Sequence, residues 1–242
     1  MIETETSLSV LYRDAMMLVI DKPVGVAVHA GPKGGPSLED RFDQLRYGLP
    51  RRPALAHRLD RDTAGCLVLG RHRKALAKLG QLFKMGKIDK TYWALVAGGP
   101  ADDEGSIDAP MAKLDVDRGW WMKVDSSGQP AQTTWKVLGR GMIDGRPAAW
   151  MALSPLTGRT HQLRVHCQHM GWSILGDPIY GDRANRDATL NLLARRIDVP
   201  LYAGKAPIIV EAPPPAHMLA GLAACGLDQD DVSSNRHLAP AF

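Results

Sequence analysis

The stretch of this 242-residue chain with the clearest chemical potential runs from His57 to Gly65 (His-Arg-Leu-Asp-Arg-Asp-Thr-Ala-Gly). Three basic side chains surround two carboxylates there, Asp60 and Asp62. A carboxylate beside arginine stays ionised, as a nucleophile or a general base requires. Two carboxylates could also form the acid and base pair of a glycoside hydrolase, although spacing in sequence fixes no separation in space. A surface turn with exposed ion pairs would leave the same pattern.

A second polar cluster, over residues 156–166, combines a turn with cations. Gly158 permits a tight turn, after which the free backbone N–H groups of a helix start could face phosphate. Arg159 and Arg164 add two cations, and either one could pair with a catalytic carboxylate. An ordinary helix N-terminus with solvent-facing polar residues would look the same.

Motifs for metals and nucleotide cofactors are missing from the sequence. His161, His166 and His169 follow no Cys/His zinc spacing, so we predict no metal site. The glycine-rich loops that bind dinucleotides or phosphates and the serine nucleophile elbow are also missing. The sequence therefore contains no motif that would indicate a dehydrogenase, a P-loop kinase or a serine hydrolase. We predict no cofactor.

The elements that must position these clusters alternate without a regular βαβ repeat. Strand patterns occupy residues 8–20, Cys66–Leu69, Lys90–Val96, Gln132–Leu138 and Ala148–Leu153, with one or two more over 191–210. Helical patterns follow the Cys66 strand, with Leu76, Leu79, Leu82 and Phe83 on one face, and recur over 160–170 and 216–224. This mixture predicts an α+β fold with a largely antiparallel sheet.

Tyr92 lies in the strand pattern that follows the first of these helices. Aromatic residues in strands most often belong to the core. A tyrosine can also stack on a base that has left its helix, as happens in enzymes that act on nucleotides. The residue type and its position leave both possibilities open.

The formal net charge of +4 is distributed unevenly along the chain. From Arg51 to Lys90, eleven Lys and Arg stand against three Asp, so this segment carries +8 and the rest carries −4. Arg71, Lys74 and Lys78 are spaced to share one face of the predicted helix. A local basic field is typical of a nucleic-acid contact surface, although a solvated helix face would give the same count.

Cysteine usage and hydropathy favour a cytoplasmic protein. The three cysteines form no C-x-x-C pair and cannot make a fully paired disulfide framework. The longest early apolar run, residues 15–20, is too short to span a bilayer or to act as a signal segment. We therefore predict no membrane association.

Four motifs, taken in order, resemble those of the RluA/RsuA superfamily of pseudouridine synthases. They are Asp21-Lys22-Pro23-Val24-Gly25 with His29; His57-Arg58-Leu59-Asp60 with Thr63 and Gly65; Lys90-Thr91-Tyr92 with Ala94-Leu95-Val96 and Gly98; and Gly158-Arg159-Thr160-His161-Gln162-Leu163-Arg164-Val165-His166, continuing to Gly176-Asp177-Pro178 and Tyr180-Gly181. Their order and approximate spacing agree over roughly residues 8–220. The resemblance is to compact members, in which no additional RNA-binding domain precedes the core.

The resemblance implies roles for the matching residues. Asp60 would be the catalytic aspartate, Tyr92 would stack on the flipped uridine and assist proton removal, and Arg164 would pair with Asp60 and hold it ionised. Arg58 matches a position that, in some members, probes the space a flipped base vacates. The further candidates for contact with RNA or base are His57, Thr63, Arg159, Leu163, Arg71, Lys74 and Lys78.

The resemblance also implies an architecture. We expect a pseudouridine synthase fold, α+β, with a central mixed, largely antiparallel sheet, flanking helices, and a cleft between two subdomains. The catalytic domain would cover residues 8–224, with 225–242 as a mobile tail, and the protein would act as a monomer without cofactor or metal. Two departures stand out, since Ala64 replaces the usual Ser and Leu193 replaces a frequent His.

The sequence therefore predicts an isomerase that converts specific uridines in rRNA or tRNA to pseudouridine by base flipping and a catalytic aspartate. A second hypothesis is an RNA-binding module that keeps the fold without catalysis, and the joint presence of Asp60, Tyr92 and Arg164 argues against it. A third, glycoside hydrolysis by a carboxylate pair, requires Asp62 to matter as much as Asp60.

Overall fold

The computed structural model describes residues 7–31, 34–115, 121–182 and 188–228. Its strands are β1 (Val10–Arg13), β2 (Met17–Lys22), β3 (Ala54–Leu55), β4 (Ala64–Gly70), β5 (Asp89–Ala97), β6 (Glu104–Asp108), β7 (Met111–Lys113), β8 (Met122–Val124), β9 (Gln132–Ile143), β10 (Arg146–Pro155), β11 (Leu192–Val199) and β12 (Ile208–Glu211). Its helices are the 3-10 helix η1 (Leu38–Leu45) and the α-helices α1 (Arg73–Lys84), α2 (Gln162–His169) and α3 (Ala216–Ala224).

One sheet of ten strands runs through the described part of the chain, in the order β1-β2-β4-β11-β5-β10-β9-β6, with β3 beside β4 and β12 beside β11. Its strand pairs are antiparallel except for β4 and β11, which are parallel. Strands β7 and β8 form a small separate hairpin. The predicted α+β class and the mixed, largely antiparallel sheet are confirmed.

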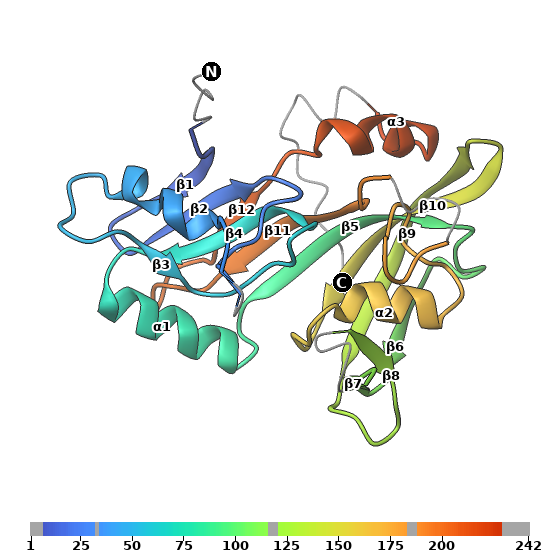
Figure 1. Cartoon of the computed structure of the whole chain (residues 1–242), viewed down its shortest axis with the longest axis horizontal. Helices are drawn as coiled ribbons and strands as arrows, with labels where there is room; N and C mark the ends of the chain where they lie inside the picture. The colour runs from blue at the N-terminus through green and yellow to red at the C-terminus, as the bar shows by residue number, and fades with distance from the viewer. Residues whose placement is uncertain (1–6, 32–33, 116–120, 183–187, 229–242) are drawn as a thin grey trace.

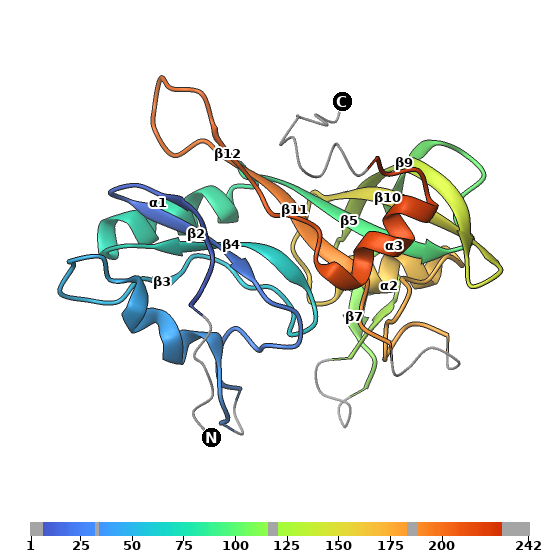
Figure 2. The same cartoon turned by 90° about the horizontal axis from the view of Figure 1, so that it is seen from above.

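The sheet joins two lobes (Figures 1 and 2). One lobe holds β1 to β4, η1 and α1, the other holds β6 to β10 and α2, and the long strands β5 and β11 extend from one lobe to the other. Strand β11 pairs with β4 on one side and with β5 on the other, so hydrogen bonds continue across the junction. The strands of both lobes therefore belong to one continuous sheet.

Strand β4 explains why its segment reads as a continuous apolar run. Both faces of the strand are covered, as expected for a strand buried within a layered fold. Cys66 and Val68 pack with Leu79 of α1 in one core cluster. Leu67 and Leu69 pack against η1 in another cluster. The chain leaves this strand at a turn that determines where α1 begins.

Helix α1 begins later than the basic spacing implies. His72 is its N-cap, and its Nδ1 accepts a hydrogen bond from the backbone N–H of Ala75, a contact that fixes a helix start. Arg71 therefore precedes the helix, and its guanidinium donates to the backbone carbonyl of Asp14. The prediction that Arg71 shares a helix face with Lys74 and Lys78 is wrong, because the N-cap excludes it from the helix.

Gly65 allows the parallel contact between β4 and β11. Its φ is +104°, and a Cβ at this position would lie 2.4 Å from the carbonyl oxygen of Ala194. Any other residue would push the two strands apart. This requirement gives a structural reason for the glycine that closes the His57–Gly65 cluster.

The carboxyl-terminal helix α3 matches its predicted range, and the chain stays packed beyond it. Cys225 and Leu227 are buried in the largest core cluster, so the compact domain continues past the expected boundary at 224. Residues 229–242 of the expected tail lie outside the described residues. Among the residues that are described, no helix is both long and apolar enough to span a membrane.

Candidate active site

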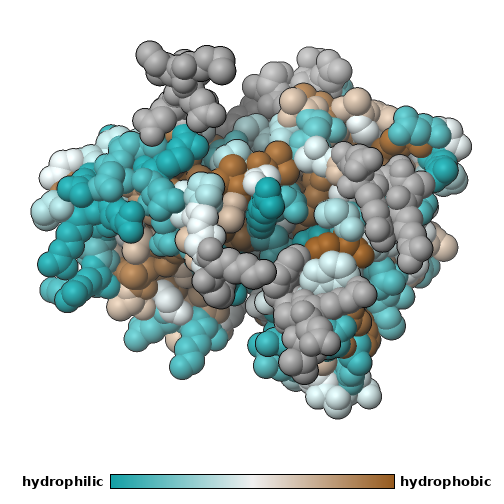
Figure 3. Space-filling model, viewed as in Figure 1, coloured by the Kyte–Doolittle hydropathy of each residue, from teal (hydrophilic) through white to brown (hydrophobic). Residues whose placement is uncertain are grey.

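A cleft of about 1780 Å³ opens where the two lobes meet. Four segments contribute most of its lining: residues 57–63, 83–92, 154–164 and part of β11. Figure 3 shows this side of the molecule, where apolar side chains are exposed in the depression between hydrophilic surfaces. The cleft exceeds the usual size of a small-molecule pocket, about 300–1,000 Å³. It could admit part of a macromolecule.

Asp60 lies in the loop that leads into β4. The backbone N–H of Thr63 donates to the Asp60 carbonyl at 3.2 Å, which closes a turn, and Thr63 itself is buried. The Asp60 side chain keeps 27% of its surface exposed and faces the cleft. The turn thus holds one carboxylate at the cleft lining.

Lys22, at the end of β2, fastens this loop to the amino-terminal motif. Its side chain is fully buried, and Nζ donates to the carbonyl oxygens of Pro23, Val26 and Arg61 at 2.7, 2.9 and 2.8 Å. Burial lowers the pKa of Lys22 to about 8, against the opposing pull of nearby carboxylates. Sequence reasoning quoted the motif but gave Lys22 no function, although a lysine placed before Pro-Val-Gly was the available signal.

His57 is placed differently from an RNA-binding cation. Its Nε2 accepts a hydrogen bond from the backbone N–H of Val68 at 3.0 Å, and its ring stacks on Phe83 with centroids 4.6 Å apart. Burial, with a smaller contribution from Lys90, lowers the pKa of His57 to about 3. His57 is therefore neutral near pH 7; it lines the cleft and supports the loop that carries Asp60.

Arg164 on α2 reaches Asp60 and also holds a second, closer carboxylate. Its Nη1 lies 3.6 Å from Asp60 Oδ2. Its Nε and Nη2 donate to Asp177 Oδ2 and Oδ1 at 2.7 and 2.8 Å, the two-pronged geometry that arginine makes with carboxylates. Arg164 and Asp177 are almost completely buried. The predicted Asp60–Arg164 pair exists, and Asp177 orients it.

Asp177 is a residue whose function sequence reasoning missed. Burial alone would raise the pKa of Asp177, but the Arg164 hydrogen bonds and two backbone N–H groups outweigh it and lower that pKa. The two N–H groups belong to Ile179 and Tyr180, which donate to Asp177 Oδ1 at 2.9 Å each. The Gly176-Asp177-Pro178 motif carried the available signal, but nothing in it identified Arg164 as the partner.

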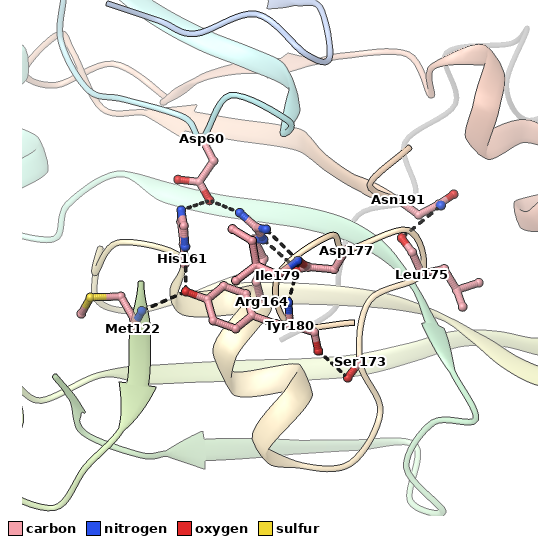
Figure 4. A network of polar contacts seen from close by, with 10 residues as sticks. All are labelled: Asp60, Met122, His161, Arg164, Ser173, Leu175, Asp177, Ile179, Tyr180 and Asn191. Atoms are coloured by element: carbon pink, nitrogen blue, oxygen red, sulfur yellow. Dashed lines mark hydrogen bonds and ion pairs between the residues drawn. The ribbon is translucent and has the colours of Figure 1, made fainter. Parts of the chain in front are cut away.

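His161 and Tyr180 complete the polar network around Asp60 (Figure 4). His161 Nε2 lies 3.9 Å from Asp60 Oδ2, and its Nδ1 lies 2.8 Å from the Tyr180 hydroxyl. His161 has a φ of +55°, in the left-handed region, so α2 begins at Gln162 rather than at the predicted residue 160. Neither side chain was given a function from the sequence.

Tyr92, on β5, is half-buried and lines the cleft. Its strand neighbours are Ala194 on β11 and Leu153 on β10, so the ring lies at the junction of the lobes. Burial raises the pKa of Tyr92, and the negative charge of Asp60 raises it further. The phenol is therefore protonated near pH 7 and is a poor base, which disfavours the proton-removal role and leaves stacking as the prediction.

The model of the RNA pseudouridylate synthase family matches residues 16–169, more than half of this chain. The chain belongs to the RNA pseudouridylate synthase family. An uncharacterized RNA pseudouridine synthase of Zymomonas mobilis is 40% identical over 209 residues, covering 85% of this chain and 93% of that protein. The ribosomal large subunit pseudouridine synthase C of Vibrio parahaemolyticus is 38% identical over 177 residues, covering 72% of this chain and 53% of that protein. This chain thus matches about half the length of the Vibrio relative.

A solved structure supports the same family. The human RNA pseudouridylate synthase domain containing 1 superposes with a TM-score of 0.74 at 28% identity, covering 94% of each chain. The predicted family, the pseudouridine synthase fold and the isomerase activity on uridine in RNA are confirmed. The catalytic roles of Asp60, Tyr92 and Arg164 stay predictions.

This pseudouridine synthase presents two exposed arginines from the loop that carries Asp60. Arg58 Nη1 lies 3.1 Å from His29 Nε2, and Arg61 Nε donates to the Gly25 carbonyl at 3.0 Å. Both arginines line the cleft. Their positions suit contact with a polyanion entering it.

The remaining predicted site residues of the synthase divide into two groups. Thr63, Leu163 and Arg159 line the cleft. Arg159 Nε also donates to the Pro130 carbonyl at 3.0 Å, so one N–H of its guanidinium is already hydrogen-bonded within the protein. Arg71, Lys74 and Lys78 are not among the lining residues, and their contact with RNA stays a prediction.

No group of three or more His, Cys, Asp or Glu is placed to hold a metal ion within the described segments of the chain. His166, which the sequence left as a metal question, is buried and bonded to Thr133 and to the Ala109 carbonyl. It therefore contributes to packing between α2 and the strands beneath it.

Proposed function

We propose that this synthase isomerises a uridine within rRNA or tRNA, with Asp60 as the catalytic residue and Tyr92 and Arg164 beside it. The observation that carries the proposal is a partly exposed carboxylate that lines a cleft and pairs with a buried arginine, which a second carboxylate holds in place. The Arg164 charge keeps Asp60 ionised and ready to react. The large-subunit rRNA is the first RNA to examine, given the name of the Vibrio relative.

The reaction requires the uridine to leave its stack. Extrusion costs on the order of a few kcal/mol, and contacts between exposed cations and phosphates can offset that cost. Tyr92 offers a ring for the extruded uracil at the junction of the lobes. Arg58 and Arg61 supply positive charge at the same cleft.

The chemistry conserves every heavy atom of the nucleotide. The N1–C1′ bond breaks, the uracil turns, and a C5–C1′ bond forms; the hydrogen on C5 leaves as a proton, and N1 gains one. Asp60 can start this sequence by attacking the sugar, by attacking the base, or by removing a proton from C2′. All three routes need an ionised carboxylate within reach of the nucleotide.

Release of tritium tests the proposal. RNA labelled at uridine C5 is prepared from cells that lack this gene and is incubated with the protein. The wild-type chain should release tritium, and Asp60→Asn should release none while it still binds RNA. Binding without release by the wild-type chain would instead identify an RNA-binding module.

Asp62→Asn separates the proposal from carboxylate-pair hydrolysis. Asp62 lines the cleft but is not joined to Arg164 by any ion pair that the described structure contains. We expect Asp62→Asn to keep turnover within about threefold of wild type, a change of less than 1 kcal/mol in the barrier. Equal loss in both variants would favour a carboxylate pair.

We propose further that the protein acts as a monomer in the cytoplasm. His161 and Arg164, which contact Asp60, belong to the same chain as Asp60. Sedimentation of the active protein should give the mass of one chain, 26.3 kDa, and a dimer would contradict the proposal.

A further inference from the structure

His161 and Tyr180 form a chain of contacts that ends at Asp60 and that the proposed reaction does not use. The backbone N–H of Met122 donates to the Tyr180 oxygen at 2.9 Å. The Tyr180 hydroxyl lies 2.8 Å from His161 Nδ1, and His161 Nε2 lies 3.9 Å from Asp60 Oδ2. Figure 4 shows the three contacts leading from β8 to the catalytic carboxylate.

The donors and acceptors in this chain determine where the imidazole proton lies. Tyr180 accepts a hydrogen bond from Met122 and its O–H can donate to His161 Nδ1, while His161 Nε2 faces the Asp60 carboxylate, which can only accept. Nδ1 is thus the acceptor of a neutral imidazole, and Nε2 carries the hydrogen. The opposite tautomer would aim the lone pair of Nε2 at the Asp60 carboxylate, which is unfavourable. Burial lowers the pKa of His161, in keeping with a neutral ring.

Both groups that reach Asp60 contact the same oxygen. Arg164 Nη1 lies 3.6 Å and His161 Nε2 lies 3.9 Å from Oδ2. Such contacts are often long in unliganded sites and shorten when substrate binds. With Oδ2 held from two sides, the other oxygen, Oδ1, is the one presented to the nucleotide.

Asp177 fixes this arrangement from below. Its carboxylate holds Arg164 with two hydrogen bonds and also receives the backbone N–H of Tyr180. The backbone of His161 is in the left-handed region, which costs a residue with a Cβ on the order of 1 kcal/mol. That conformation lies next to the start of α2 and turns the imidazole toward the cleft.

Building on the proposed function, we propose that His161 is a positioning residue that holds Asp60 Oδ2 with a neutral Nε2–H, that Tyr180 sets its tautomer, and that Oδ1 is the reacting oxygen. The pair acts through Asp60 and need not touch the uridine. Loss of the pair should therefore lower kcat and leave KM nearly unchanged.

Two substitutions of His161 test the donor. Asparagine adopts the left-handed conformation readily, so His161→Asn should fold, but its amide is too short to reach Asp60. Glutamine places an amide N–H near the position of Nε2. We expect kcat for tritium release to fall about ten- to a hundredfold in His161→Asn and to recover most of that loss in His161→Gln. KM should stay within about twofold in both.

Tyr180→Phe tests the tautomer. The ring keeps its place near Arg164, where the guanidinium lies 5.2 Å from its centroid, and only the hydroxyl is lost. We expect kcat to fall about two- to tenfold. The same change in a His161→Gln background should have no further effect, because an amide always carries N–H. Tyr202→Phe, which removes a hydroxyl bonded to Asp14 outside the cleft, is the matched control and should match wild type.

Nitrogen-15 NMR of histidine-labelled protein supplies a readout that is independent of turnover. The signal that disappears in His161→Gln should show the Nε2–H tautomer, and Tyr180→Phe should reduce that preference. A wild-type Nδ1–H tautomer, unchanged kcat in His161→Asn, or equal loss from Tyr180→Phe in both backgrounds would overturn the inference. If wild-type protein released no tritium, the proposed function would fail, and the tautomer would still be decided.

Discussion

The two walls of the cleft carry arginines in opposite surroundings. The loop wall, residues 57–63, presents Arg58 and Arg61 to solvent. The helix wall, residues 157–180, contains Arg164 with 2% of its side chain exposed, against Asp177 with 1%. An exposed ion pair contributes about 0–1 kcal/mol and is weakened by salt, whereas breaking a buried pair costs about 3–5 kcal/mol. The loop wall is suited to hold RNA, and the helix wall to hold a reacting group in place.

The largest effect should come from breaking the buried pair. Asp177→Asn keeps the shape of the side chain but removes the closer of the two carboxylates that pair with Arg164. We expect the free energy of unfolding to fall by about 3–5 kcal/mol, with a loss of at least tenfold in kcat because Asp60 loses its fixed neighbour. Urea unfolding and tritium release measure the two effects.

Asp103→Asn is the matched control for that experiment. Asp103 pairs with Arg140 at 2.7 Å, but its side chain is 79% exposed. Its removal should change stability by less than about 1 kcal/mol. Similar losses from Asp103→Asn and Asp177→Asn would erase the distinction between buried and exposed pairs.

The next effect concerns the partly buried histidine of the loop wall, His57. The pKa of His57 in the folded chain, about 3, lies below the value of 6.5 for a free histidine. Between pH 3 and pH 6.5, His57 is therefore protonated in the unfolded chain and neutral in the folded chain. Stability should therefore fall as the pH is lowered from 6.5 toward 3, by on the order of a few kcal/mol. Urea unfolding at several pH values should show this slope in wild type and a shallower one in His57→Gln.

An exposed histidine provides the comparison for His57. His217→Gln is the matched histidine variant, because His217 is exposed and lies outside the cleft lining. If His57→Gln left the pH dependence unchanged, the neutral assignment of His57 would be wrong.

A smaller effect, confined to binding, should follow from Arg58→Gln. Measured in an Asp60→Asn background to prevent turnover, the variant should bind RNA about three- to tenfold more weakly at moderate salt. The slope of log affinity against log salt should decrease by about 0.7–0.9, the share of one phosphate contact. Stability should change by less than about 0.5 kcal/mol. A change in stability with no change in salt slope would assign Arg58 a structural role.

The smallest effect should come from Lys74→Gln combined with Lys78→Gln. Both residues lie on α1 outside the cleft lining, and Lys78 is 5.9 Å from the Tyr202 ring. We expect RNA affinity to change by less than about twofold. If each lysine substitution lowered the slope of log affinity against log salt about as much as Arg58→Gln does, the RNA contact would extend over α1, as the sequence predicted.

Local patterns predicted the elements well. The apolar run before α1 is a buried strand, and 216–224 is a helix, because burial on both faces and helical spacing are legible in sequence. The three residues predicted to act together, Asp60, Tyr92 and Arg164, do line one cleft. Motif order, rather than charge, pointed to them.

Features that depend on burial were beyond the sequence. His57 counted as a possible cation, but a hydrogen bond from Val68 and contact with Phe83 make it neutral. Arg71 has helical spacing, yet the His72 cap begins the helix after it. The sequence did not show that Asp177 is the closer partner of Arg164. The two hydrogen bonds between the Arg164 guanidinium and Asp177 form only in the folded chain.

The continuity of β4, β11 and β5 has a consequence for how the enzyme selects its substrate. A ladder of hydrogen bonds that passes beneath both walls resists a jaw-like closing of the lobes, since opening or closing would bend or break paired strands. We therefore expect the cleft to keep its width when RNA binds, so that the RNA supplies the deformation. The free energy needed to extrude a uridine is lowest in weakened stacks, loops and bulges. The synthase would thus sort uridines by how easily the surrounding RNA yields, as well as by their sequence.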